Sequence, residues 1–146
     1  MTAGTEPGIC NCAALRQAAR QVSRLYDEAL APAAVSLNQF SVLARMDAVG
    51  SSTVQELAQR LVMDRSTLGH LLRPLAARGL VKLGVSKTDR RSREVTLTSA
   101  GKALLAKARP LWATAQRRFE RGFGEMPALD LRAILRRVAT LEFDRS

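Results

Sequence analysis

The chain has 146 residues, of which 47% are hydrophobic and 4% aromatic, and its formal net charge is +10. This composition excludes a disordered chain and favours one domain of packed helices, while the excess of cations indicates nucleic acid as a partner. Two cysteines and one histidine are too few for a disulfide framework or a structural zinc site, so no metal and no cofactor is expected.

The chain opens with an arm and two predicted helices. Residues 1–11 contain several turn-forming residues and should form a flexible arm. Apolar residues then recur every three or four positions over Cys12–Leu30, which predicts an amphipathic helix that Pro32 ends. Ser36 and Gln39 have the spacing of a capping box, which predicts the start of a second helix.

Two shorter helices should follow with almost no spacer. Thr53 and Glu56 form a second capping box before about two turns of helix. Asp64 is a suitable N-cap for the next helix, and Gly79 is suited to end it. A helix of two turns is not stable alone and must pack against its neighbours, so this order predicts a helix-turn-helix.

A basic β-hairpin and two further helices complete the prediction. Apolar and polar residues alternate over Val81–Ser86 and again over Glu94–Thr98, which predicts two strands around the polar turn KTDRRS. A long helix should follow, bend at Pro110 without stopping, and end before Pro127, and a last helix should cover about residues 128–141. The expected fold is mainly α with a small β-wing.

The helices outside the helix-turn-helix carry more apolar residues than a DNA-binding unit needs. We therefore expect residues 12–35 and 99–146 to form a helical dimerisation region, and residues 36–98 to form a winged helix-turn-helix. A two-fold dimer would place two recognition helices one DNA turn apart, roughly 34 Å. An enlarged monomeric core is the alternative.

The helix after Asp64 is expected to read DNA. A helical wheel places its leucines on one side and Ser66, His70 and Arg73 on the other, with Thr67 at the edge. The N-terminal half of this face should enter the major groove, where Arg73 can pair with guanine and the hydroxyl groups can bind phosphates or base edges. A merely solvated helix face is the alternative.

The turn of the hairpin concentrates positive charge. Its cations are Lys87, Arg90, Arg91 and Arg93, and an arginine on such a protruding turn can enter the minor groove of DNA. Asp89 stands two residues before Arg91 and can pair with it, which would fix the turn and leave fewer cations for DNA. A solvated loop is the alternative.

These segments together resemble the MarR (multiple antibiotic resistance regulator) family of winged-helix transcription factors, over about residues 12–141. The strongest matches are ELAQRLVMDRSTLGHLLRPLAARGLV and DRRSREVTLTSAGKALL, and YDEALAPAAVSLNQFSVL resembles the family's junction between its first two helices. The resemblance implies an obligate homodimer that binds double-stranded palindromic promoter DNA. Such proteins are usually repressors that a small ligand or oxidation releases.

The resemblance also implies roles for individual residues. The major-groove residues would be Arg65, Ser66, Thr67, His70 and Arg73, and Arg90, Arg91 or Arg93 would serve at the wing. A ligand pocket would lie between the dimer helices and the winged domain. Its candidate residues are Tyr26, Phe40, Leu43 and Trp112, and the alternative is that each simply belongs to the core. A small aromatic or acyl ligand is the expected effector.

Several positions depart from the family pattern. Gly69 and His70 stand where Ser or Thr followed by Arg is frequent, and Ala34 occupies a common glycine position. Pro74 lies inside the recognition helix, where it removes the backbone hydrogen bond to the carbonyl of His70. These departures affect the base preference and leave the DNA-binding class unchanged.

Cys12 aligns, by its spacing to Tyr26, with the reactive cysteine of the family's organic-hydroperoxide-sensing branch. A thiolate near the N-terminus of a helix is stabilised, which favours oxidation. Against this role, Leu37 replaces the second tyrosine of that branch, and Cys10 is too close for an easy internal disulfide. A peroxide sensor that uses Cys12 and a buried, inert thiol both stay open.

Other classes of function are less favoured by the sequence. The chain has no paired carboxylate motif, no phosphate-binding glycine loop and no metal-ligand cluster, so no catalytic site is expected. A winged helix used only for protein contacts is the alternative of another class, but such modules often lose the basic residues that this chain keeps. The sequence shows neither a membrane span nor a signal peptide, so we expect a cytoplasmic protein without membrane contact.

Overall fold

The computed structural model describes residues 8–143; residues 1–7 of the predicted arm, and residues 144–146, lie outside the described residues. In chain order the elements are α1 (Asn11–Leu30), the 3-10 turn η1 (Ala31–Ala33), α2 (Leu37–Val49), β1 (Ser52–Thr53), α3 (Val54–Arg60), α4 (Arg65–Ala77), β2 (Val81–Val85), β3 (Arg93–Leu97), α5 (Ser99–Phe123) and α6 (Glu125–Ala139). None of the helices described is both long and apolar enough to cross a membrane.

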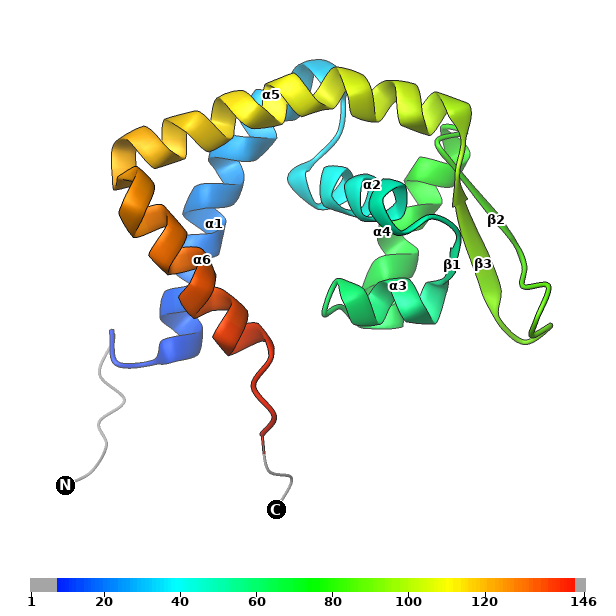
Figure 1. Cartoon of the computed structure of the whole chain (residues 1–146), viewed down its shortest axis with the longest axis horizontal. Helices are drawn as coiled ribbons and strands as arrows, with labels where there is room; N and C mark the ends of the chain where they lie inside the picture. Colours follow the sequence, from blue (N-terminus) through cyan, green and yellow to red (C-terminus); the bar gives the residue numbers. More distant parts are fainter. Residues whose placement is uncertain (1–7, 144–146) are drawn as a thin grey trace.

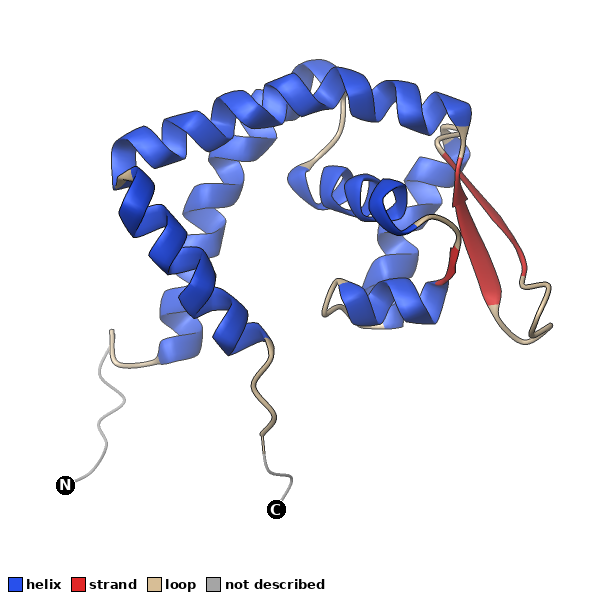
Figure 2. Ribbon diagram, in the orientation of Figure 1, coloured by secondary structure: helices blue, strands red, loops and turns tan. Residues whose placement is uncertain are grey.

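Helix α5 connects the two ends of the molecule. Figure 1 shows it as an arch, with α1 and α6 at one end and α2, α3 and α4 beneath the other. Helix α1 packs along α5, and α6 folds back from its last turn. The strands lie only at the end of α5 that carries α4 (Figure 2). The prediction of a mainly helical chain with a small β-wing is confirmed.

Side-chain caps define where the central helices begin. The Ser36 hydroxyl accepts from the Gln39 N–H at 3.1 Å, and the Gln39 side chain accepts from the Ser36 N–H at 3.0 Å. Thr53 and Glu56 form the same reciprocal pair at 3.1 and 3.3 Å. Both predicted capping boxes are therefore confirmed, and each satisfies two N–H groups that have no partner within the helix.

Prolines have different effects in the last two helices. Helix α5 continues through Pro110, as predicted. The prediction that Pro127 precedes the last helix is wrong, because Gly124 (φ 105°) separates the helices and α6 begins at Glu125. Pro127 lies in the first turn of α6, where the N–H that proline lacks would have no helical acceptor.

The sheet holds the wing against the start of α3. Its strand order is β1-β3-β2, and both pairings are antiparallel. The hairpin of β2 and β3 was predicted, whereas the two-residue strand β1 was not. Ser52 pairs with Val95, and Thr53 pairs with Glu94. Because α3 begins immediately after Thr53, this pairing fixes its first turn beside the base of the hairpin.

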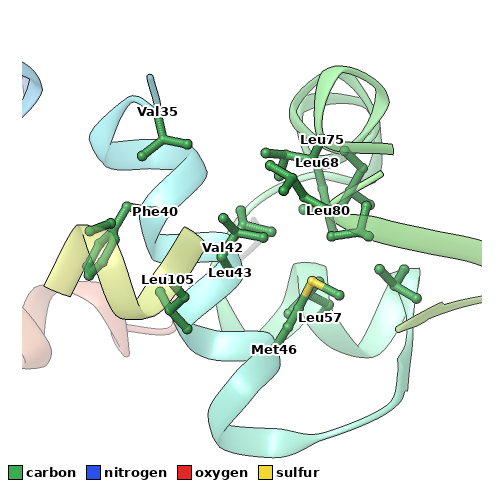
Figure 3. Packing of buried hydrophobic residues seen from close by; sticks show 14 of the residues in the cluster. Val35, Phe40, Val42, Leu43, Met46, Leu57, Leu68, Leu75, Leu80 and Leu105 are labelled. Atoms are coloured by element: carbon green, nitrogen blue, oxygen red, sulfur yellow. The ribbon is translucent and has the colours of Figure 1, made fainter. Parts of the chain in front are cut away.

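One hydrophobic core lies beneath the helix-turn-helix. Leu57 of α3 and Leu68 of α4 are fully buried together with Val42, Leu43 and Met46 of α2. Figure 3 shows these side chains gathered with Leu105 of α5 in one cluster. Burial of each such side chain stabilises the fold by about 1.5–3 kcal/mol. The predicted apolar side of α4 is confirmed, because Leu68, Leu72 and Leu75 are buried.

A chain of polar contacts joins α1, α5 and α6. The Tyr26 hydroxyl donates to Gln116, whose amide nitrogen donates to Glu120 Oε1 at 3.2 Å. Arg132 Nη1 of α6 lies 3.5 Å from the same Glu120 oxygen. Burial raises the pKa of the Tyr26 hydroxyl, and the nearby carboxylate of Glu120 raises it further.

Within the described part of the chain, two residues other than glycine adopt left-handed backbone conformations. Ala34 has φ 56°, which explains why its position resembles a glycine position of the family. The Ala34 carbonyl accepts from Arg78 Nη1 at 2.6 Å, so the α1–α2 connection is tied to the end of α4. Val62 has φ 52° in the turn between α3 and α4, and this conformation is rare for a β-branched residue.

Candidate nucleic-acid interface

Helix α4 presents its predicted reading face to solvent. Its buried side chains are Leu68, Leu72 and Leu75, and its residues predicted to bind DNA are all exposed: Arg65, Ser66, Thr67, His70 and Arg73. The helix continues through Pro74 to Ala77. The face that the helical wheel indicated is therefore accessible over the whole length of the helix.

Asp64 fixes the N-terminus of α4. Its Oδ1 accepts from the Thr67 N–H at 2.6 Å. This backbone hydrogen bond, followed by one from the Thr67 hydroxyl, holds the pKa of the Asp64 carboxyl below its usual value. The Asp64 cap is confirmed, and it engages the hydroxyl of Thr67, which sequence reasoning assigned to DNA.

The turn of the wing exposes all four of its predicted cations, Lys87, Arg90, Arg91 and Arg93. The prediction that Asp89 forms an ion pair with Arg91 is wrong. The ion pairs found within residues 8–143 do not include these two residues. Asp89 Oδ1 instead accepts from the Arg91 N–H at 3.0 Å, and Oδ2 accepts from the Ser92 hydroxyl at 3.3 Å. An aspartate two residues before an N–H readily forms such a turn. Asp89 thus shapes the wing, and the Arg91 guanidinium has no carboxylate partner among the residues that the structure describes.

A hollow of about 380 Å³ lies between α4 and the wing, and we call it the basic hollow. It brings together residues that were predicted separately for the helix and for the wing. Its lining consists of Val54, Gln55, Arg65, Ser66, Arg91, Ser92 and Arg93. Gln55 and Ser92 were missed by sequence reasoning, because the pairing of β1 with β3 that brings α3 to the wing was not visible in the sequence.

The four predicted ligand-binding residues separate into two groups. Phe40 and Trp112 stack with ring centroids 6.0 Å apart and planes at 16°. They line a second hollow of about 350 Å³ together with Ser41, Ala44, Arg45, Ala48, Leu61 and Arg109. Leu43 is only 1% exposed and belongs to the core, and Tyr26 belongs to the contacts between α1 and α5. We call this second hollow the aromatic hollow.

Both cysteines are exposed at the start of α1 in the single chain. Cys10 is the N-cap residue, and its Sγ accepts from the Ala13 N–H at 3.4 Å. Cys12 lies in the first turn. The buried Cys12 thiol that was one of the two expectations is therefore not found in the single chain.

Helix α6 leaves most of its apolar side chains uncovered. Ala128 is its buried residue. The exposed apolar residues at this end of the molecule are Leu15, Phe123, Met126, Leu129, Ile134, Leu135, Val138 and Leu141. Exposed apolar side chains that are gathered at one end of a molecule often mark a contact with another molecule.

Known proteins that are similar to this chain in sequence or structure are transcriptional regulators, and some of them were solved with DNA. A sequence profile of the MarR family matches residues 35–92. The M. tuberculosis transcriptional regulator MosR, solved in complex with DNA, is 35% identical, and the match covers 89% of this chain and 93% of MosR with a TM-score of 0.80. The transcriptional repressor CouR, solved on a 23-mer DNA duplex, is 32% identical over 89% of this chain and 92% of CouR, also with a TM-score of 0.80.

A more distant relative is also a transcriptional regulator. The HTH-type transcriptional regulator Hpr of Exiguobacterium sibiricum is 27% identical over 127 residues, which are 82% of this chain and 67% of Hpr. Similarity to MosR and CouR extends over both the winged helix-turn-helix and the flanking helices. The chain therefore belongs to the MarR family of transcriptional regulators.

Proposed function

We propose that this protein is a homodimer that binds palindromic promoter DNA sequence-specifically and represses transcription until a small ligand releases it. The observation that carries this proposal is that Arg65 and Ser66, at the start of α4, line one hollow together with Arg91 and Arg93 of the wing. The DNA complexes of MosR and CouR, and the description of CouR as a repressor, support it.

The test of specific binding is affinity for genomic fragments over a range of salt concentrations, with recovery of bound fragments across the genome to define the operator. Arg73→Ala should weaken binding to the operator more than to random DNA, because a base contact is lost. Arg90→Ala should weaken both and flatten the salt dependence. Equal affinity of the unmodified protein for all fragments would refute specific regulation, and no binding would favour a module for protein contacts.

The proposed homodimer uses residues 12–35 and 99–146, where the uncovered apolar side chains lie. Ile134 is 54% exposed in the single chain, so Ile134→Asp should leave the fold of each chain intact. In a dimer this side chain would be covered, and a buried unpaired charge is strongly unfavourable. Light scattering should therefore show a dimer for the natural chain and for Ile134→Val, and a monomer for Ile134→Asp. A monomeric natural chain would refute this part.

The aromatic hollow is the proposed site of the releasing ligand. Its stacked rings suit a planar apolar group, and Arg45 and Arg109 suit a carboxylate. Arg109 Nη2 lies 2.9 Å from Asp47 Oδ2, whereas Arg45 has no ion-pair partner within residues 8–143. A small aromatic carboxylate, or an acyl group that ends in one, matches this chemistry.

Trp112 provides the readout because it is the single tryptophan of the chain. Titration with a panel of aromatic carboxylates should quench its fluorescence and release DNA at the same concentrations. Arg45→Gln should weaken this response at least tenfold, whereas Arg118→Gln, which is the same change outside this hollow, should not. Release of DNA without any change in Trp112 fluorescence would show that the ligand binds outside the aromatic hollow.

The exposed thiols favour a second candidate, which is a regulator that senses peroxide through Cys12. Peroxide should then abolish DNA binding by the natural chain and leave DNA binding by Cys12→Ser unchanged. The same measurement on Cys10→Ser shows whether Cys10 takes part in the response. DNA binding that peroxide does not alter would exclude this form of regulation.

A further inference from the structure

We propose that the basic hollow is a binding site for a single phosphate group, and that in the DNA complex this group is one phosphodiester of the backbone. The first statement stands on the hollow alone, and the second rests on the proposed function. The hollow would then set the position of α4 along the groove without reading any base.

The hollow carries positive charge that no nearby carboxylate of the described residues compensates. Arg65 comes from α4, whereas Arg91 and Arg93 come from the end of the wing turn and the start of β3. Within residues 8–143 the ion pairs join Arg109 to Asp47 and Arg132 to Glu120, so none of the three arginines around the hollow has a carboxylate partner. Their mutual repulsion is relieved when an anion binds between them.

The neighbouring acids are engaged elsewhere. Each of the four carboxylates closest in sequence accepts a hydrogen bond from a backbone N–H or from a serine hydroxyl. These contacts are Glu56 with the Thr53 N–H, Asp64 with the Thr67 N–H, Asp89 with the Arg91 N–H and the Ser92 hydroxyl, and Glu94 with the Ser51 hydroxyl. Within residues 8–143 these acids therefore bond to groups other than the three guanidinium groups and form no ion pair with them.

The lining of the hollow supplies several hydrogen-bond donors for an anion. Three guanidinium groups can donate in pairs to phosphate oxygens, which is their preferred geometry. Gln55, Ser66 and Ser92 add neutral donors on the same lining. No carboxylate takes part in the lining, so the hollow would attract a phosphate and disfavour a cation.

The backbone around the hollow is preformed in the free protein. The pairing of Thr53 with Glu94 holds α3 to β3, and Asp89 fixes the turn from which Arg91 and Ser92 project. Little backbone freedom is therefore lost when an anion binds, and the ordering is confined to the exposed arginine side chains. Arg65 is the first residue of α4, so a phosphate held there fixes the point at which the helix enters the groove.

This inference divides the predicted DNA-binding residues by role. Arg65 and Arg93 contact the backbone and contribute equally on every sequence, whereas His70 and Arg73, which do not line the hollow, read bases. The sequence-based expectation placed Arg65 among the residues that read the major groove, so the two assignments make opposite predictions for Arg65.

The experiment compares Arg65→Gln and Arg93→Gln with Arg73→Gln and with Lys107→Gln, which removes a charge on α5 away from the hollow. Affinity is measured on operator and random duplexes across salt. Each hollow variant should lower both affinities by the same factor and reduce the slope of log K against log salt by roughly one per protomer. Arg73→Gln should lower the ratio between operator and random affinity, and Lys107→Gln should change neither quantity.

A second measurement needs no DNA. Sodium phosphate should raise the Tm of the natural chain above its value in sodium chloride of equal ionic strength, because it binds only the folded state. Arg93→Gln should lose most of this difference and Lys107→Gln should keep it. Phosphate stabilisation with no DNA binding would retain the site and refute the proposed function. An unchanged salt slope in Arg65→Gln and Arg93→Gln, or a selective loss of operator affinity, would overturn the proposal while DNA binding stands.

Discussion

Gly101 lies where α5 leaves the wing, and Gly101→Ala tests how closely the two are joined. A Cβ at this position would come within 2.1 Å of the Leu80 carbonyl oxygen and 2.6 Å of Leu97 Cδ1. The Leu97 side chain can move, but the Leu80 carbonyl belongs to the backbone. It also accepts from the N–H and the hydroxyl of Thr98 at 3.1 and 3.0 Å, so the substitution must displace α5 from the hairpin.

The magnitude follows from the contacts that this displacement breaks. Two hydrogen bonds to Leu80 each contribute about 1 kcal/mol net, and overpacking at a rigid contact costs about 1–3 kcal/mol. Alanine recovers about 1 kcal/mol through its higher helix propensity. The free energy of unfolding should therefore fall by about 2–4 kcal/mol.

Urea denaturation followed by circular dichroism, at fixed protein concentration, measures this difference. Gly69→Ala is the matched control, because its helix is α4 and nothing lies within 4 Å of the added Cβ. That variant should be more stable than the natural chain by up to about 1 kcal/mol. If Gly101→Ala proves as stable as Gly69→Ala, the close approach of α5 to Leu80 does not hold in solution and the reasoning fails.

Further predictions concern the turn and the cap of the helix-turn-helix. Val62→Gly should raise the unfolding free energy by about 1 kcal/mol, because the left-handed conformation costs Val62 roughly 1–2 kcal/mol and its side chain is 70% exposed; Val62→Ile should give no gain in a urea titration. The pKa of the Asp64 carboxyl is lower in the folded than in the unfolded state. Its contribution to the free energy of unfolding is therefore complete above the unfolded pKa, about 3.9, and is lost as pH falls through the folded pKa. Stability relative to Asp64→Asn should therefore be constant near neutral pH and decline below about pH 4, and a constant difference down to pH 2 would contradict the cap.

The helix starts could be predicted because short side chains determine them. Ser36, Thr53 and Asp64 each accept a hydrogen bond from the third residue that follows, and this geometry depends only on local sequence. The start of α6 was predicted wrongly because proline is compatible with the first helical turn as well as with a break. Local sequence does not distinguish these two positions of Pro127.

The basic hollow was not predicted, and only Phe40 and Trp112 of the aromatic hollow were, because the rest of each lining depends on contacts between distant segments. Strand β1 has two residues and no alternation of its own, and it exists because β3 offers it a partner. Without that pairing, Gln55 has no visible relation to Arg93. Similarly, Asp47 and Arg109 meet only because α2 packs across α5. The exposed face of α4, in contrast, follows directly from the spacing of its leucines.

The polar chain from Tyr26 through Gln116 and Glu120 to Arg132 has a consequence for assembly. It ties α1, α5 and α6 together within one chain, so each protomer would present its pairing surface already shaped. Association would then resemble the docking of two rigid bodies, with little ordering entropy lost at contact. Newly made chains would pair soon after they fold, and subunits of two labelled populations would exchange without unfolding.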